Sequence, residues 1–341
     1  RRAIELFMKE HGDTVAGHKV EVIYRDTTGA NPEISRRAAQ ELVTRDRVQF
    51  LAGFGLTPNA LAAAPVATKT ETPMIIMNAA ATAFVPTRSP YIVRFSLSQP
   101  QVTKPLAAWA ARNGIKSVYV MVPDYAPGID TEKYFSAAFT AAGGKIVGSV
   151  KTPISNVEYA PYLQRAADAQ PDAILFMSPS GDQGLQFLKA FRERGLDKRM
   201  KVLSTGELTD EIVLDTFGDE ALGLVTSMHY SMAHDSPENR AYVAAWQKAY
   251  GADARPNWYA TGAWDGMAAI YHVIRELKGK IDAEPVLKVL KGYQAQSPRG
   301  PIRIDDDRDV VQNIYIRRVE RVGGKLQNVE FETFENVATE L

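Results

Sequence analysis

The chain has 341 residues, and its 40 basic residues balance its 40 acidic residues, so its formal net charge is zero. This length predicts about two domains, and the balanced charge argues against a nucleic-acid binder, because neutralising phosphates needs a basic excess. The absence of Cys excludes disulfides, thiolate metal sites and cysteine nucleophiles. No stretch approaches the roughly 18 consecutive apolar residues that a membrane-spanning helix needs.

Short β-branched runs alternate with amphipathic segments along most of the chain, which opens with a helical pattern over residues 1–11. The expected strands are residues 20–24, 48–52, 74–77, 118–122, 145–150, 173–177, 202–204 and 224–228. The expected helices between them are residues 32–44, 58–68, 101–113, 131–142, 160–169, 183–194 and 210–217. Strands separated by helices in this way indicate βαβ units and parallel sheets.

After residue 230 the pattern changes to long helices (237–250, 258–277 and 283–292) and a final strand meander (302–304, 310–319 and 329–334). We therefore predict an α/β fold with two doubly wound parallel-sheet lobes. The expected lobes are residues 1–115 plus 231–307 and residues 116–230 plus 308–341. Ligands of open α/β sheets bind beyond the carboxyl ends of the strands, so a ligand cleft between the lobes is expected.

The most informative local feature is a Gly-x-Gly turn at Gly53 and Gly55, followed by Thr57 and Pro58. The pattern predicts that Thr57 caps a helix and that its hydroxyl, with the N–H groups of residues 59 and 60, forms a small anion site. The alternative is that Thr57 is a helix cap and nothing more. The third glycine of a dinucleotide fingerprint is missing, and no P-loop Lys follows.

Further candidate ligand contacts follow other strands. Asn78, Ala79, Ala80 and Thr82 form a loop in which small residues let a ligand approach the backbone. In the second half, Tyr125 is a candidate wall for an apolar or aromatic ligand, and Ser180, Gly206 and Glu207 lie in equivalent loops. Glu207 is either the partner of a ligand cation or hydroxyl, or a solvated loop acid. Tyr230 and Trp264 are further candidate walls, although the aromatic residues of the 258–277 helix are more typical of a core.

No catalytic or metal-binding constellation is evident. His229 and His234 lack the His-Glu-x-x-His spacing of a zinc site, and no Gly-x-Ser-x-Gly elbow is present. Residues 305–307 are three aspartates that we interpret as a solvated turn. We therefore expect no enzyme activity, no cofactor and no metal.

Several phrases, taken together with the order of the elements, resemble the solute-binding proteins of the branched-chain amino acid ABC-transport family. The matching phrases are Gly17 to Val22, Tyr24 to Asp26, Ala39 to Val43, Gly53 to Pro58, Ser89 to Arg94, Asp124 to Gly128, Pro171 to Ala173, Gly223 to Tyr230, Ala263 to Asp265 and Ser297 to Gly300. The resemblance implies two lobes joined by three crossovers that close on a ligand. It also implies that Thr57 and the backbone of residues 79–82 hold a ligand carboxylate.

In this family an aromatic residue at the Tyr125 loop and an acid at the Gly206–Glu207 loop meet an amino-acid ligand. Here the tyrosine lies two places before the family position, and the acid is offset. These differences are more similar to the branch that binds aromatic carboxylates such as hydroxybenzoates. The resemblance therefore implies a binding component of an ABC importer, with a small carboxylate and a membrane permease as partners. A branched-chain amino acid ligand, or a sensor such as an amide-responsive regulator, is the alternative.

The resemblance also implies that a first, central strand precedes Arg1, because the family's first strand has no counterpart in these residues. A signal peptide upstream of that strand, and hence a periplasmic, monomeric protein, is expected on the same grounds.

Overall fold

The computed structural model describes residues 1–84, 89–178 and 181–341, which form two compact units. Unit 1 comprises Arg1–Ser98 and Ser236–Gln312, and unit 2 comprises Gln99–Asp235 and Asn313–Leu341. The chain therefore passes between the units three times, after Ser98, Asp235 and Gln312.

The first passage differs from the expected boundary at residue 115. Helix α4 (Gln99–Arg112) belongs to unit 2, because it packs on α5 (Ala126–Ala141) and on β9 (Lys201–Thr205) and β10 (Val225–Met228). The other two passages lie five residues after the expected boundaries at 230 and 307.

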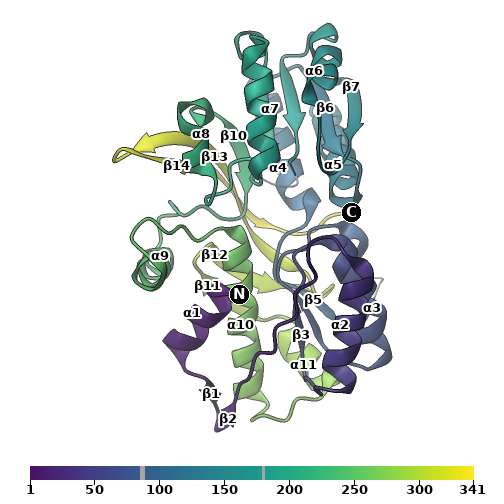
Figure 1. Cartoon of the computed structure of the whole chain (residues 1–341), viewed down its shortest axis with the longest axis vertical. Helices are drawn as coiled ribbons and strands as arrows, with labels where there is room; N and C mark the ends of the chain where they lie inside the picture. The colour runs from purple at the N-terminus through teal and green to yellow at the C-terminus, as the bar shows by residue number, and fades with distance from the viewer. Residues whose placement is uncertain (85–88, 179–180) are drawn as a thin grey trace. The chain divides into compact units, whose positions relative to one another are not determined.

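Unit 1 is built on a parallel sheet of β3 (Leu51–Gly53), β4 (Met74–Ile76) and β5 (Ile92–Arg94). Helices α2 (Pro32–Thr44) and α3 (Thr57–Lys69) pack together on one side, and α1 (Arg2–His11) and α10 (Trp258–Glu276) lie together on the other (Figure 1). The remaining elements are the hairpin β1 (Thr14–Val15) and β2 (His18–Lys19), helices α9 (Pro237–Tyr250) and α11 (Ala283–Leu290), the one-turn helix η1 (Thr82–Phe84), and strands β11 (Gln294–Ser297) and β12 (Gly300–Ile304).

One expected strand of unit 1 does not form. Residues 20–24 are extended but carry no strand pairing, so the prediction of a strand there is wrong for the described residues. The physical reason is that no neighbouring strand lies beside them: β3 pairs with β4 on one edge, and its other edge has no partner strand in the described chain.

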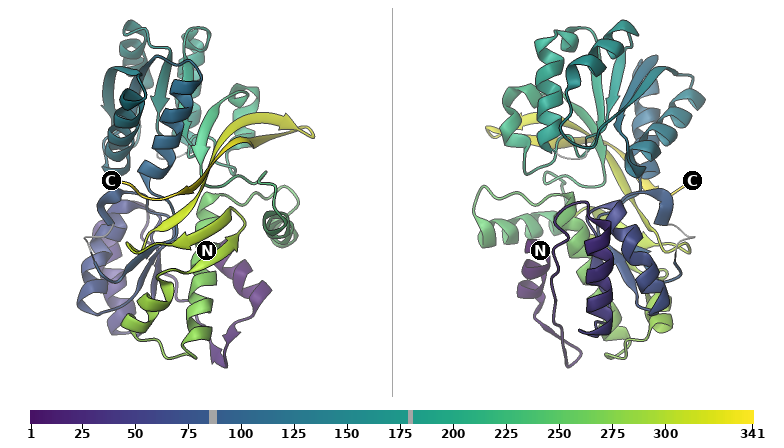
Figure 2. Two further views of the ribbon diagram at one scale, coloured as in Figure 1. Left: turned by 180° about the vertical axis from the view of Figure 1, so that it is seen from behind. Right: turned by 45° about the vertical axis from the view of Figure 1, so that its right-hand side comes forward.

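Unit 2 contains a parallel sheet in which β10, β9, β8 (Ala173–Phe176), β6 (Ser117–Pro123) and β7 (Lys145–Thr152) follow one another. Strand β13 (Val310–Val322) starts in unit 1, paired with β12, and continues in unit 2, where it pairs with β10 and β14 (Lys325–Val337). The other helices are α6 (Tyr159–Asp168), α7 (Gly181–Glu193) and α8 (Leu214–Phe217), with the short turns η2 (Leu196–Lys198) and η3 (Gly218–Ala221) (Figure 2).

The side chains of β6 show that this sheet is covered on both faces. Val118, Val120 and Val122 pack into one buried cluster with residues of α4 and α5, whereas Tyr119 and Met121 pack into a second with residues of α6 and α7. Alternate residues of a strand point to opposite faces, so a continuous apolar run is the signature of a doubly covered parallel strand. The predicted α/β class with parallel-sheet lobes is confirmed.

Candidate functional site

In unit 1 the candidate site begins where β3 turns into α3. Gly53 (φ 109°) and Phe54 (φ 65°) both adopt left-handed conformations, which reverse the chain sharply before the helix. The helix begins at Thr57 itself, with Leu56 as its N-cap, so the prediction of Thr57 as the cap is wrong. The Thr57 side chain is only 2% exposed. Its hydroxyl has no hydrogen-bond partner in the described part of the chain.

The backbone around Thr57 differs from the expected anion site in one respect. The N–H of Ala60 donates to the carbonyl of Leu56 at 3.2 Å, so it is already used within the helix. Asn59 anchors the first turn, because its amide donates to the Thr27 hydroxyl at 2.9 Å and to the Gly29 carbonyl at 2.7 Å. The Thr57 hydroxyl is therefore the group that this turn offers to a ligand.

The loop after β4 lies beside this turn, since the N–H of Ala79 donates to the carbonyl of Phe54 at 3.0 Å. The carbonyl of Ala79 accepts from the Ser96 hydroxyl at 3.0 Å, and the carbonyl of Ala81 accepts from Arg94 at 2.7 Å. Ala79 and Ala80 are buried, and η1 begins at Thr82. The structure thus brings the predicted residues 57 and 78–80 to neighbouring strand ends. Hydrogen bonds from Arg94 and Ser96 fix the loop that contains residues 78–80.

Helix α10 approaches this loop closely through a glycine. A Cβ atom on Gly262 would lie 2.1 Å from the carbonyl oxygen of Met77, so only glycine fits. The approach allows the Asn78 amide to donate to the carbonyl of Tyr259 at 3.1 Å. Tyr259 is therefore a neighbour of the loop, although its helix was expected to place its aromatic residues in the core; its ring is tilted against that of Trp258 at a centroid distance of 3.7 Å.

Trp264 lies elsewhere on α10. Its ring makes edge contacts with Phe7 and Tyr242 at 4.9 Å each and with His11 at 5.5 Å, so it packs beneath helix α1. Its neighbour Asp265 accepts from the Ser297 hydroxyl at 3.0 Å and pairs with Arg299 at 2.8 Å. These contacts give Trp264 a structural role in unit 1, and the proposal that it forms a ligand wall finds no support in them.

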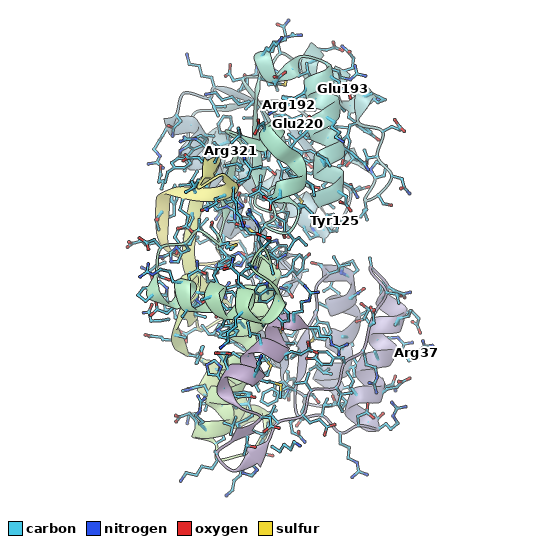
Figure 3. All side chains as sticks on the ribbon, turned by 60° about the vertical axis from the view of Figure 1, so that its left-hand side comes forward. Arg37, Tyr125, Arg192, Glu193, Glu220 and Arg321 are labelled. Carbon is cyan, nitrogen blue, oxygen red and sulfur yellow. The ribbon has the colours of Figure 1, made fainter. Side chains whose placement is uncertain are left out.

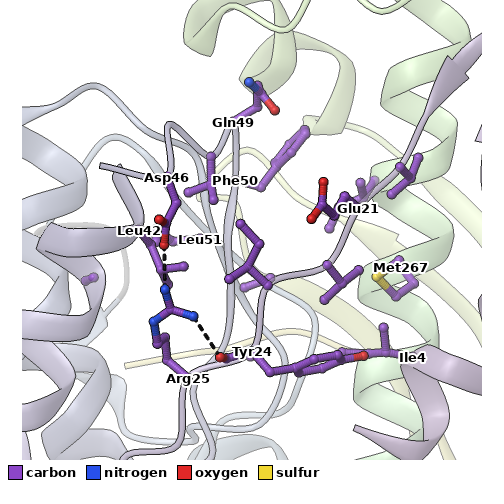
Figure 4. A pocket seen from close by; sticks show the side chains of 18 of the residues that line it. Ile4, Glu21, Tyr24, Arg25, Leu42, Asp46, Gln49, Phe50, Leu51 and Met267 are labelled. Carbon is purple, nitrogen blue, oxygen red and sulfur yellow. Dashed lines mark hydrogen bonds and ion pairs between the residues drawn. The ribbon is translucent and has the colours of Figure 1, made fainter. Parts of the chain in front are cut away.

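A cavity of about 950 Å³ in unit 1 lies apart from these candidate residues (Figure 4). It separates the extended segment 20–27 from the unpaired edge of β3. Ala39 and Leu42 of α2 line it from one side, and Ile4, Met267 and Ile270 of α1 and α10 line it from the other. The space therefore lies beside the open edge of the sheet, between the helices that cover its two faces.

In unit 2 the candidate site is centred on Glu207, directly after β9. Glu207 is buried (8% exposed), so the expectation of a solvated loop acid is not met. Burial raises the pKa of its carboxyl above the ordinary value, while Thr205, Gln99 and the charge of Arg317 lower it. Although Thr205 and Gln99 are near, Glu207 Oε2, Thr205 Oγ1 and Gln99 Nε2 all lack a well-formed hydrogen bond among the described residues.

Arg317 of β13 lies beneath the Glu207 turn and is 2% exposed. Its guanidinium donates to the Tyr230 carbonyl at 2.6 Å, the Gly206 carbonyl at 3.4 Å, and the Thr226 and Thr209 hydroxyls at 3.0 and 3.3 Å. A Cβ atom on Gly206 would lie 2.5 Å from Arg317 Nη2, which explains the glycine. Tyr230 is 1% exposed, so it contributes its carbonyl to this network and its ring to the buried interior.

Tyr125 precedes α5 and is half-buried against the apolar cluster of α4 and α5 (Figure 3). The helix starts at Ala126, and residue 128 is a glycine because a Cβ atom there would lie 2.0 Å from the carbonyl oxygen of Pro123. Ser180 lies outside the described residues, and the structure does not bear on its predicted role.

Sequence reasoning missed Gln99, Thr205 and Arg317. A signal for Arg317 exists, since a charged residue interrupts the apolar run of a strand, and such a residue needs buried partners. No local sequence feature marks Gln99, which lies near Glu207 only because of the fold.

Across the described ranges no cluster of three or more potential metal ligands occurs. In those same ranges, no helix combines the length and the apolar character needed to cross a bilayer.

Comparison with known proteins shows which proteins have a similar sequence and fold. Residues 1–325 match the profile of a periplasmic binding protein family. A Leu/Ile/Val-binding protein homolog 6 from Brucella melitensis is 41% identical over 338 residues, which cover 98% of this chain and 86% of the relative.

Two solved structures are similar over nearly the whole chain. A solute-binding protein of an ABC transporter from Rhodopseudomonas palustris BisB5, in complex with 3,4-dihydroxybenzoic acid, is 47% identical with a TM-score of 0.94, covering 99% of this chain and 92% of its own. A second, from R. palustris HaA2 in complex with p-hydroxybenzoic acid, is 40% identical with a TM-score of 0.94, covering 98% and 91%. The chain belongs to the periplasmic binding protein family.

Proposed function

We propose that this protein is the periplasmic solute-binding component of an ABC importer and that its solute is a hydroxybenzoate-like aromatic acid. The observation that carries the proposal is the buried Glu207 carboxyl, which retains an oxygen without a hydrogen-bond partner among the described residues. Buried polar groups are nearly always paired in native proteins. An unpaired oxygen at a strand end, where α/β sheets hold ligands, is therefore an acceptor for a ligand donor.

Each unit by itself offers one of the groups that an aromatic hydroxy acid needs. The Thr57 hydroxyl of unit 1 donates to the ligand carboxylate, and the start of α3 favours a negative charge. Glu207 of unit 2 accepts from the ring hydroxyl, and Tyr125 supplies an apolar wall. The ligands of the 47% and 40% identical solved structures are hydroxylated benzoic acids, which supports the same chemistry. None of these roles requires bond-making chemistry, and a membrane permease is the expected partner of a monomer.

A branched-chain amino acid is the second candidate, favoured by the Leu/Ile/Val-binding name of the 41% identical relatives. Its ammonium would pair with Glu207, because an unpaired buried charge costs several kcal/mol.

Calorimetry on protein stripped of bound solute by unfolding and refolding separates the candidates. We expect 4-hydroxybenzoate and 3,4-dihydroxybenzoate to bind with micromolar or lower Kd and leucine to bind weakly or not at all. Tight leucine binding that is lost in Glu207→Gln would overturn the aromatic assignment and support the amino acid.

A further inference from the structure

The surroundings of Glu207 contain a buried cation whose contacts are all with neutral atoms. Among the described residues, the five hydrogen bonds of the Arg317 guanidinium end on the Thr226 and Thr209 hydroxyls and on the Gly206 and Tyr230 carbonyls. A guanidinium is a permanent charge with a rigid fork of donors. Such a charge, buried without a carboxylate in contact, is costly unless it serves neighbouring anions.

Four carboxyl groups surround that charge. Their electrostatic effect on Arg317, in decreasing order, comes from Glu211, Glu330, Asp210 and Glu207. Three of these carboxyls accept hydrogen bonds from groups other than Arg317. Glu211 accepts from Asn328 at 2.9 Å and Met232 N–H at 3.2 Å, Glu330 pairs with His234 at 2.8 Å, and Asp210 accepts from the N–H of Ile212 at 3.0 Å.

Glu207, like Glu330, has one buried oxygen without a hydrogen-bond partner among the described residues, but Glu330 is paired with His234 through its other oxygen, whereas Glu207 forms no ion pair there. It is also attached directly to the residue that Arg317 holds. Arg317 bonds the Gly206 carbonyl, and the N–H of Gly206 donates to Ser227 at 3.0 Å, so the turn is fixed on both sides. The absent side chain of Gly206 leaves room for the guanidinium. The guanidinium and the glycine together define where the Glu207 backbone lies.

We propose that Arg317 is a positioning residue for ligand selection: it fixes the Gly206–Glu207 turn and keeps the Glu207 carboxyl as an acceptor for the hydroxyl of the ligand. The ligand class selected in this way is an aromatic acid with a hydroxyl donor on its ring, in preference to the same acid without one. This inference rests on the proposed function and concerns selectivity within it.

The mechanism joins geometry and charge. A carboxyl that is buried away from any cation tends to hold its proton, because burial disfavours the charged form. A protonated carboxyl competes as a donor with the ligand hydroxyl. The positive charge of Arg317 opposes this effect at Glu207. Other titratable groups lie near Arg317 and stay unchanged when Arg317 alone is replaced, so their electrostatic effect on Glu207 is common to all variants. These groups are Asp210, Glu211, Glu330 and His234.

The test compares 4-hydroxybenzoate with benzoate by calorimetry between pH 5.5 and pH 8.5. In the native protein we expect at least about tenfold tighter binding of the hydroxylated acid, which is about 1.4 kcal/mol. In Arg317→Met this preference should fall to about threefold or less, and the remaining preference should become stronger as pH rises. Arg317→Lys should recover part of the preference, and Glu207→Gln should show little preference at any pH.

Two controls separate selectivity from general damage. Benzoate affinity should change less than about threefold in Arg317→Met, because the carboxylate contacts lie at Thr57. Thr226→Val, which removes a hydroxyl that accepts from both Arg317 Nε and Nη2, should weaken the preference while keeping the charge. If Arg317→Met does not fold, Arg317→Lys and Thr226→Val carry the test.

Equal losses of both acids in these variants, with an unchanged pH profile, would show that Arg317 is merely structural and overturn the inference. If neither acid binds the native protein, the proposed function itself fails, which is a distinguishable result.

Discussion

Arg94 and Asp309, 215 positions apart in the sequence, form a two-pronged ion pair in which both side chains are completely buried. The guanidinium nitrogens lie 2.8 and 2.6 Å from the two carboxylate oxygens, and the third donor reaches the carbonyl of Ala81 at 2.7 Å. The pair therefore joins the end of β5 to the residue before β13, and it also fixes the loop that follows β4.

Removing one partner of this pair should be strongly destabilising. Arg94→Met leaves the Asp309 carboxylate buried and uncompensated, and such changes typically cost about 3–5 kcal/mol. Chemical denaturation followed by circular dichroism measures the loss. The double variant Arg94→Met/Asp309→Leu should recover much of it, and Arg36→Met, which breaks an exposed pair with Glu33, should cost less than about 1 kcal/mol. A comparable loss at Arg36 would contradict the assignment of the cost to burial.

Thr57→Val should weaken binding of the aromatic acid with little effect on the free protein. A hydrogen bond to a charged group contributes about 1.5–3 kcal/mol. Since the hydroxyl has no partner among the described residues and caps no helix, its removal should change the free energy of unfolding by less than the roughly 1 kcal/mol of an N-cap. Thr70→Val is the control, because that hydroxyl donates to the Val66 carbonyl at the other end of the same helix. Unchanged affinity in calorimetry would remove Thr57 from the site.

Glu207→Gln should stabilise the ligand-free protein while impairing hydroxyl recognition. Burial raises the pKa of Glu207 above the ordinary value of 4.5, so the folded state binds this proton more tightly than the unfolded state. Stability then falls as pH rises from about 4.5 through the raised folded pKa. The amide variant escapes that loss, and we expect a gain on the order of 1 kcal/mol at neutral pH. Thermal unfolding at pH 4.5 and pH 7.5 tests this. Glu158→Gln, which changes an exposed acid, serves as control. If the gain in stability of Glu207→Gln does not grow between pH 4.5 and pH 7.5, the raised pKa of Glu207 is contradicted.

Two glycines of α10 provide a matched pair. Gly262→Ala places a Cβ atom 2.1 Å from the backbone oxygen of Met77, whereas Gly266→Ala meets only the flexible end of the Met77 side chain at 2.5 Å. The first change must move the helix away from the strand end and should lower the free energy of unfolding by about 1–3 kcal/mol. It should also break the hydrogen bond between the Asn78 amide and the Tyr259 carbonyl and weaken ligand binding. The second should cost less, because the Met77 side chain can move aside; the helix preference of alanine, about 1 kcal/mol, is common to both variants. Denaturation and calorimetry on both variants compare them, and equal costs would show that the backbone contact is not decisive.

The alternation of apolar runs and helices was sufficient to predict the α/β class. A strand such as β6 is apolar along its whole length because both of its faces are buried. Strand pairing is less local. Residues 20–24 have the composition of a strand but lack a neighbour, and no property of these residues alone reveals that. Similarly, α4 has no sequence feature that assigns it to unit 2; its packing partners α5 and β9 decide this.

The candidate site was predictable where it depends on strand ends. Thr57 and Ala79 come shortly after β3 and β4 in unit 1, and Glu207 comes shortly after β9 in unit 2. Parallel topology places such residues at the carboxyl ends of the strands of their own sheet. For Trp264 the sequence does not distinguish a ligand wall from a core contact, and the ring contacts that the structure shows are with Phe7 and His11 of a distant segment. Arg317 was missed for the same reason: its partners Gly206 and Tyr230 lie about 90–110 residues away in the chain.

The space beside β3 has a consequence for how the protein behaves at high concentration. The open edge of β3 and the facing segment 20–27 present main-chain groups with no sheet partner among the described residues, and unpaired strand edges are templates for pairing with other chains. An extended segment that pairs with this edge, from the same chain or from another copy, removes the template, so covering the edge limits self-association at high concentration.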